Sequence, residues 1–185
     1  MDKQSILRFA QSIIIIPFLT TTIPLASIGK DKVVPPVAMT IEEKILNERA
    51  EKIDRYFRDR NMPLHGYGKK MVIESDKNSL DWRLLPAIAV RESTGGKYAC
   101  GNNPFGWGSC KIKFDSVEES IEILAWNLSG KNPNTTSYYE TESVYKKLHR
   151  YNGTVVPSYP EEVITIMRRI DKEPVNSDDS PKNKS

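Results

Sequence analysis

One glutamate in this sequence stands where a general acid would be placed. In the stretch VRESTGGKYACGNNPFGWGS, residues 90–109, Glu92 follows directly on the apolar helical run LLPAIAV. Half-burial of a carboxyl group at such a helix end disfavours its charged form. Cleavage of a glycosidic bond needs an acid that keeps its proton near neutral pH, because the leaving oxygen must be protonated. We therefore weigh Glu92 as a general acid against the alternative of a solvated residue at a helix end.

The glycine-rich loop after this glutamate carries groups that suit a sugar ligand. Phe105 and Trp107 offer an apolar wall or a flat face for a sugar ring, and Asn102 and Asn103 can hydrogen-bond hydroxyl or acetamido groups. Glycines such as Gly106 let the backbone approach a ligand closely. The loop is thus a candidate glycan-binding segment.

The N-terminus, residues 1–29, is typical of a secretory signal peptide. Lys3 and Arg8 give it a positive start, residues 9–29 carry no charge, and Ser27 and Gly29 form the small-x-small pattern of a cleavage site. The uncharged run is also long enough to remain as a membrane anchor, but its two prolines disfavour a permanent helix. We expect a secreted, periplasmic or cell-wall-associated protein that contacts a membrane only if this segment is retained.

The chain has two cysteines, Cys100 and Cys110. An even count in an exported chain favours a disulfide, which here would close the glycine-rich loop. Two cysteines without nearby histidines do not form a zinc site, and His65 and His149 lie far apart in the sequence. We expect no metal and no cofactor.

Length and composition indicate one globular domain with polar ends. The chain has 185 residues, of which 38% are hydrophobic and 28% charged, and its net charge is +3. This mild basic excess lacks the clustered Lys and Arg of a nucleic-acid-binding protein, although it suits contact with an anionic matrix such as a cell wall. We expect a monomer without a nucleic-acid partner.

Apolar periodicity and capping residues predict a mainly α domain of five or six helices over residues 41–170. Residues 30–40 are expected to be a linker and residues 171–185 a disordered tail. Thr40 and Glu43 form a capping box before a first helix that should end near Arg60.

The segments around Glu92 are expected to be a helix, an extended piece and another helix. Asp81 is predicted to be the N-cap of a helix over residues 82–92, although Pro86 favours a start nearer Leu84. KIKF, residues 111–114, would be a short strand or an extended piece, giving at most a minimal β-hairpin. Further helices are expected at residues 69–77, 116–128, 141–150 and 158–170.

The combined motif around Glu92 resembles that of the lysozyme-like glucosaminidase family. These mannosyl-glycoprotein endo-β-N-acetylglucosaminidase-like domains cleave peptidoglycan glycan strands, and they share an apolar helix, A-x-x-E-S-x-x-G and then N-N-P/L-F-G. Here residues 89–96 read AVRESTGG and residues 102–107 read NNPFGW. The match is good over residues 81–128 and weaker to residue 170. Residues 151–153, YNG, are also similar to the Tyr-Asn segment of lytic transglycosylases, which share the lysozyme-like fold.

The resemblance implies a lysozyme-like domain with a disulfide-closed active-site loop and Glu92 as general acid. It further implies a set of residues that line the glycan groove or reach the reaction centre: Ser93, Asn102, Asn103, Phe105, Gly106, Trp107, Tyr138 and Tyr151. The expected activity is that of an exported glycoside hydrolase, of endo-β-N-acetylglucosaminidase or muramidase type, acting on peptidoglycan.

The sequence leaves the second catalytic group open. Retaining and inverting glycosidases use two carboxylates about 5–10 Å apart. Asp115, Glu118 and Glu119 are candidates, but we favour helix capping and interaction with the helix dipole as the explanation for them. In lysozyme-like relatives a single Glu can suffice, with the substrate's acetamido group assisting or its 6-hydroxyl attacking to give an anhydro product. A lytic transglycosylase and a non-catalytic peptidoglycan-binding wall protein therefore remain as alternatives.

Overall fold

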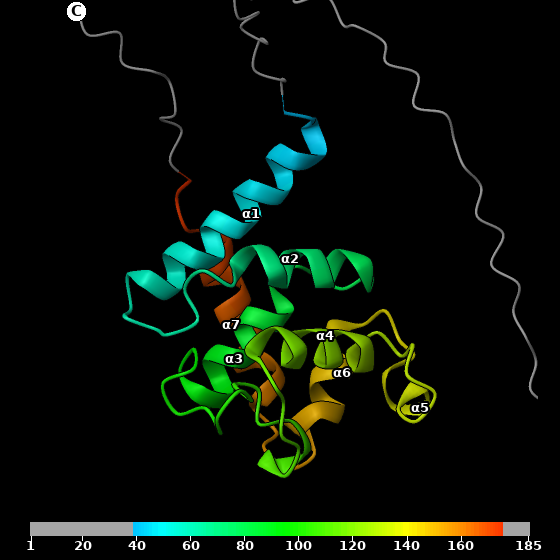
Figure 1. The fold of residues 1–185 in the computed structure, drawn as a ribbon. Coiled ribbons are helices and arrows are strands. Elements are labelled where there is room, and N and C mark those ends of the chain that lie inside the picture. Colours follow the sequence, from blue (N-terminus) through cyan, green and yellow to red (C-terminus); the bar gives the residue numbers. More distant parts are fainter. Residues whose placement is uncertain (1–38, 176–185) are drawn as a thin grey trace, which may run out of the picture. The chain divides into compact units, whose positions relative to one another are not determined.

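The structure, a computed structural model, describes residues 39–175 (Figure 1). The expected signal peptide, residues 30–38 of the linker and residues 176–185 of the tail lie outside the described residues. The α-helices are α1 (Ile41–Arg58), α2 (Gly68–Lys77), α3 (Leu84–Ser93), α4 (Val117–Leu128), α5 (Thr136–Tyr139), α6 (Val144–Leu148) and α7 (Tyr159–Asp171). A 3₁₀ turn, η1 (Trp107–Cys110), and a π-helical turn, η2 (His149–Gly153), complete the described elements.

The prediction of a mainly α chain is confirmed, but five or six helices is too low a number for residues 39–175. The short helix α5 lies between the helices predicted over residues 116–128 and 141–150, where we expected none. The predicted helix over residues 141–150 is wrong at both ends, because the Ser143 hydroxyl caps α6 by accepting from Lys146 N and the chain then widens into η2. None of the described helices is long and apolar enough to span a membrane.

Capping residues set the start of α1 as predicted. Thr40 Oγ1 accepts a hydrogen bond from Glu43 N at 3.1 Å, and Glu43 Oε2 accepts one from Thr40 N at 2.9 Å. The predicted capping box is confirmed, and α1 ends at Arg58. At α4, Ser116 caps Glu119 N, whereas the Glu119 carboxylate accepts from Asp115 N instead of closing a box.

The prediction of Asp81 as an N-cap is wrong. Its Oδ1 accepts 2.9 Å hydrogen bonds from both the backbone N and the Nε of Arg83, and α3 begins at Leu84, the start that Pro86 favoured. Of the two alternatives for residues 111–114, the short strand does not form: residues 111 and 112 lie in a turn and a bend, and the only β-type pairing within residues 39–175 is an isolated bridge between Cys100 and Asn103. The segment after residue 110 is held by Asn102 instead of by a neighbouring strand.

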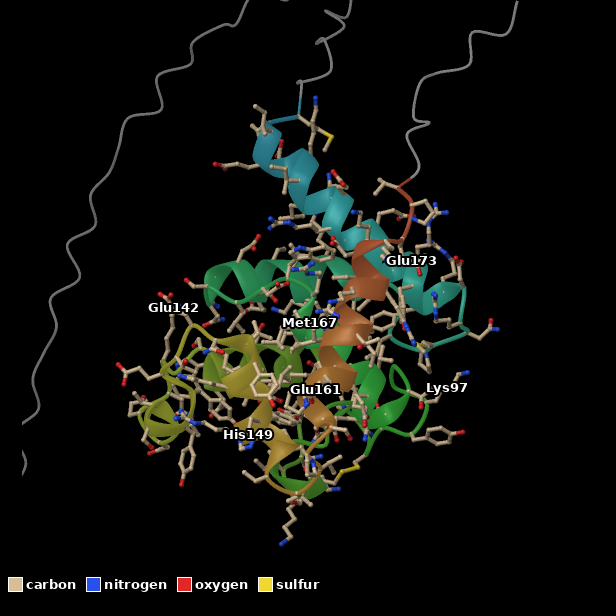
Figure 2. The ribbon with its side chains drawn as sticks, turned by 180° about the vertical axis from the view of Figure 1, so that it is seen from behind. Lys97, Glu142, His149, Glu161, Met167 and Glu173 are labelled. Atoms are coloured by element: carbon tan, nitrogen blue, oxygen red, sulfur yellow. A yellow bond between two sulfur atoms is a disulfide. The ribbon has the colours of Figure 1, made fainter. Side chains whose placement is uncertain are left out.

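Helix α3 is the buried helix of the described part. Residues 84–89 are all buried, which matches an apolar run without a polar face. Helix α3 packs mainly on α7, while α1 packs on α2, α2 on α4, and α6 on α7 (Figure 1). Figure 2 shows Met167 of α7 in the middle of the helices, with Lys97 and Glu142 at their edges. Burial of each large apolar side chain stabilises the fold by about 1.5–3 kcal/mol.

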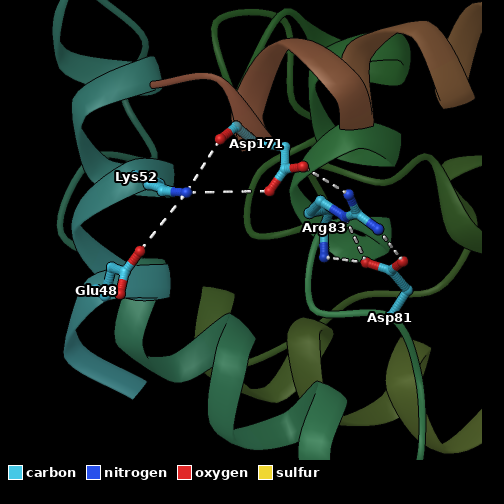
Figure 3. Close-up of polar contacts among 5 residues, drawn as sticks. All are labelled: Glu48, Lys52, Asp81, Arg83 and Asp171. Atoms are coloured by element: carbon cyan, nitrogen blue, oxygen red, sulfur yellow. Dashed lines mark hydrogen bonds and ion pairs between the residues drawn. The ribbon is translucent and has the colours of Figure 1, made fainter. Parts of the chain in front are cut away.

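Charged side chains attach the end of α7 to two other parts of the chain (Figure 3). Lys52 on α1 donates to the backbone oxygen of Asp171 at 3.0 Å, and Arg83 Nη1 donates to the Asp171 carboxylate at 3.1 Å. Arg60 also pairs with Glu173 at 2.9 Å. Asp171 and Glu173, which we assigned to the tail, therefore contact the helical part.

Arg83 also holds Asp81 through a two-pronged ion pair. Its Nε and Nη2 donate to the two carboxylate oxygens of Asp81 at 2.9 and 2.6 Å. Burial opposes ionisation of Asp81, but the hydrogen bonds and the charge of Arg83 outweigh burial and lower the pKa of Asp81. The pair fixes the chain just ahead of α3.

Replacement of Asp81 by Asn tests this pair. Because the pKa of Asp81 is lowered by folding, its contribution to stability is full above about pH 4 and is lost as the pH falls through the folded value. We expect Asp81→Asn to reduce the free energy of unfolding by about 1–2 kcal/mol near neutral pH. Urea unfolding at neutral pH and at about pH 3 measures the change; an equal loss at both pH values contradicts the assignment.

Candidate active site

Glu92 lies in the last turn of α3, where the buried helix reaches the surface. The residue is half-buried, and its Oε1 atom is buried without a hydrogen-bond partner. Thr94 and Gly95 then turn the chain with φ values of 55° and 62°. A Cβ atom at Gly95 would lie 2.6 Å from Met62 Sδ, so only glycine fits there.

Ser93 joins the end of α3 to the loop that follows. Its buried hydroxyl donates to Pro104 O at 2.7 Å and accepts from Gly96 N at 3.0 Å. These two hydrogen bonds hold residues 96 and 104 of the loop against the end of α3, next to Glu92. The contacts of Ser93 are thus with backbone, and it does not line the pocket described below.

The two asparagines and Phe105 give the loop its shape. Asn103 is buried and pairs with the backbone of Trp107, accepting from its N at 3.1 Å and donating to its O at 2.9 Å. Asn102 Nδ2 donates to Phe114 O and Asp115 O. Phe105 is fully buried in the apolar core. Their contacts hold the loop that presents Gly106 and Trp107.

Gly106 brings the loop backbone against the Glu92 carboxylate. It adopts a left-handed conformation with φ 63°, and a Cβ atom there would lie 3.3 Å from Glu92 Oε2. A side chain at this position would therefore be strained and would crowd the oxygen. Because Gly106 has no side chain, the Glu92 Oε2 atom is not covered from this side.

Tyr151 forms the third side of the site from η2. Its hydroxyl donates to Phe105 O at 2.6 Å, and its ring centroid lies 5.7 Å from that of Trp107. Burial, then the nearby charges of Glu92 and Tyr139, raise the pKa of Tyr151 well above its usual value. The phenol therefore stays protonated as a donor.

A pocket of about 360 Å³ opens at this point. Its lining residues come from three separate segments: Glu92, Gly106, Trp107, Gly108, Ser109, Tyr151 and Asn152. Glu92 is the one carboxylate among them; Asp115, Glu118 and Glu119 are not part of the lining. The pocket thus combines one acid, aromatic faces and neutral polar groups.

Two larger hollows lie elsewhere in the described part. One of about 560 Å³ includes the buried Lys147, whose ammonium group donates to Leu128 O and Tyr139 O. Another, of about 630 Å³, is lined by residues of α1 and by Asp76. No residue lining either hollow has a buried side-chain polar atom without a partner, whereas Glu92 has one. The chemistry of the side chains therefore favours the smaller pocket.

The structure brings together four of the residues selected from the sequence: Glu92, Gly106, Trp107 and Tyr151. Five others lie outside the lining: Ser93, Asn102, Asn103, Phe105 and the exposed Tyr138. Sequence reasoning missed Gly108 and Ser109 as lining residues, and it did not select Tyr159. Asn152 was not selected either, although it belongs to the YNG segment from which Tyr151 was chosen.

The predicted disulfide between Cys100 and Cys110 is confirmed. The two Cα atoms are 5.9 Å apart, and no cysteine of the chain is left free. The bond closes the loop around Gly106 and Trp107, and it is consistent with an extracellular protein. Residues 39–175 contain no group of three or more His, Cys, Asp or Glu side chains that could hold a metal ion.

Comparison with known proteins identifies no relative of this chain. No family model matches the chain, and no curated protein or solved structure is significantly similar to it.

Loss of the disulfide should lower stability. The bond joins residues ten positions apart, and a loop of this size contributes about 2–3 kcal/mol by restricting the unfolded chain. We expect a reductant to lower the melting temperature of the wild type and to leave that of a Cys100→Ser, Cys110→Ser double variant unchanged. Thermal unfolding followed by circular dichroism measures both, and an unaffected wild type contradicts the expectation.

Proposed function

We propose that this chain is an exported peptidoglycan hydrolase with a lysozyme-like domain, in which Glu92 is the general acid. The observation that supports the proposal most is the Glu92 carboxylate: one oxygen is buried without a partner, and the residue lines an open pocket with Trp107 and Tyr151. The glucosaminidase-like motif over residues 81–128 adds the substrate class.

In this proposal the pocket binds the glycan at the bond that is cleaved. The acid donates its proton to the leaving glycosidic oxygen, so that the C–O bond breaks as the O–H bond forms. Trp107 offers a ring face to a sugar, and Asn152 offers amide hydrogen bonds to its polar groups. Tyr151 supports the loop through Phe105 O and lines the pocket beside the acid.

A lytic transglycosylase is the second candidate, because the lining holds a single carboxylate. Hydrolysis by the two-carboxylate route needs a second acid to act as base or nucleophile. With one acid, the sugar's own acetamido group assists the attack of water, or its 6-hydroxyl attacks the anomeric carbon and forms an anhydro ring. Both routes use Glu92 first as proton donor.

Export is part of the proposal. The charge pattern of residues 1–29 fits a secretory signal, and the Cys100–Cys110 disulfide fits an oxidising compartment. The mildly basic net charge of +3 suits an anionic wall.

Digestion of purified peptidoglycan by the chain and by its Glu92→Gln variant tests the proposal. Gln keeps the shape of the side chain but cannot donate a carboxylic proton, so we expect release of muropeptides to fall by about 100-fold or more. Mass spectrometry of the products separates the two candidates, since reducing ends indicate a hydrolase and anhydro ends a transglycosylase.

The same experiment identifies the non-catalytic alternative. If neither protein releases fragments and both bind the sacculus equally, the catalytic assignment is wrong and the loop is a glycan-binding segment. Equal digestion by both proteins would remove Glu92 from the mechanism.

Gly106→Ala tests the close approach of the loop to the acid. A methyl group there meets Glu92 Oε2 at 3.3 Å and forces a left-handed alanine, so we expect activity to fall about 10-fold or more. Gly101→Ala is the matched control: its φ is also 63°, but no atom lies within 4 Å of the added methyl group. Rates of muropeptide release compare the two, and equal losses would mean that backbone strain alone matters.

A further inference from the structure

Tyr159 is a buried residue beside the acid that the proposed function does not yet use. It is the first residue of α7, its side chain is fully buried, and its hydroxyl has no hydrogen-bond partner. Its ring stacks on that of Tyr151, with centroids 5.9 Å apart and planes 14° apart. The Arg91 guanidinium lies 5.6 Å from the ring centroid. The aromatic stack thus fixes the ring next to Glu92.

The Tyr159 hydroxyl and Glu92 Oε1 are two buried polar atoms without partners, contributed by two packed helices, α3 and α7. A buried polar group without a hydrogen bond costs about 1–3 kcal/mol. The two groups can satisfy each other, since a phenol donates and a carboxylate accepts. Hydrogen bonds of catalytic groups are often long in substrate-free sites and shorten when substrate binds.

The electrostatic surroundings of Tyr159 agree with this proximity. Burial, followed by the charges of Tyr151 and Glu92, raises the pKa of Tyr159, while the Arg91 charge opposes the shift. The hydroxyl therefore keeps its proton and acts only as a donor or a neutral acceptor.

We propose that Tyr159 is the positioning residue of the general acid: its hydroxyl donates to Glu92 Oε1 and leaves Oε2 as the oxygen that delivers the proton. Oε2 is the oxygen next to the side-chain-free backbone of Gly106. The inference rests on the proposed function for the role of Glu92, but the contact itself does not depend on activity.

Two other donors near Glu92 are already engaged. The Tyr151 hydroxyl donates to Phe105 O, and Arg91 pairs with Glu162, which also accepts from Ser158. The Tyr159 hydroxyl, by contrast, is buried and has no other bond.

Tyr159→Phe tests the proposal, with Tyr56→Phe as control. Both changes remove one hydroxyl from a buried tyrosine, but Tyr56 lies on α1 and does not line the pocket. On soluble glycan strands we expect Tyr159→Phe to lower kcat about 10-fold to 100-fold with little change in KM, and Tyr56→Phe to match the wild type. Melting temperatures identify any loss that is due to unfolding.

A second measurement follows the acid directly. In protein labelled with ¹³C at the Glu carboxyl carbons, the Glu92 signal is assigned by its absence in Glu92→Gln. A phenol donor changes the electronic environment of the carboxyl carbon that it hydrogen-bonds, so its loss in Tyr159→Phe should move the chemical shift of that signal, whereas Tyr56→Phe should leave it in place.

The outcomes separate the inference from the function. If Tyr159→Phe leaves kcat and the chemical shift of the Glu92 signal unchanged while Glu92→Gln is inactive, the inference is wrong and the function stands. If the wild type digests nothing, the function is wrong, and the chemical shift of the Glu92 signal alone decides whether Tyr159 acts on Glu92. A shift in Tyr159→Phe that Tyr56→Phe also shows overturns the inference.

Discussion

The bridge made by the Ser93 hydroxyl is the contact on which the candidate site depends. It accepts from Gly96 and donates to Pro104, so that both ends of the loop are tied to the last turn of α3. The next residue, Phe105, then anchors the loop twice: its ring fills the core and its carbonyl oxygen accepts from Tyr151. The Ser93 hydroxyl thus fixes the position at which the Gly106 backbone contacts the Glu92 carboxylate, and the other lining residues are arranged around this contact.

The end of α3 is where the helix passes from the buried core to the protein surface. Residues 84–89 are buried, whereas Glu92 is half-buried and borders an open pocket. A helix fixed in a core holds the side chain at its end with little freedom, which suits the proposed role of Glu92 as a general acid. The aromatic rings of Trp107, Tyr151 and Tyr159 continue the core up to this point. The acid therefore stands at a boundary between packed apolar side chains and solvent.

The sequence predicts well what depends on neighbouring residues. The capping box at Thr40, the disulfide and the apolar helix before Glu92 all rest on local patterns, and the structure contains them. Asp81 has the residue type of an N-cap, yet the Arg83 guanidinium two positions away is the stronger partner for its carboxylate. Propensity alone does not decide between such partners.

The site was harder to predict, because a polar residue type does not show which group it will contact. Asn102 and Asn103 have amides suited to sugar hydroxyls, but backbone groups of the same loop occupy them. Tyr159 follows Glu92 by 67 positions in the sequence, and only the packing of α7 on α3 brings them together.

The same packing also determines when the pocket can form during synthesis of the chain. Because η2 and α7 follow the loop in the sequence, a nascent chain contains the glutamate and its loop before it contains the residues that complete the pocket. The pocket therefore forms only when folding is complete. A chain held unfolded for transport would contain the residues of the pocket but not the assembled pocket.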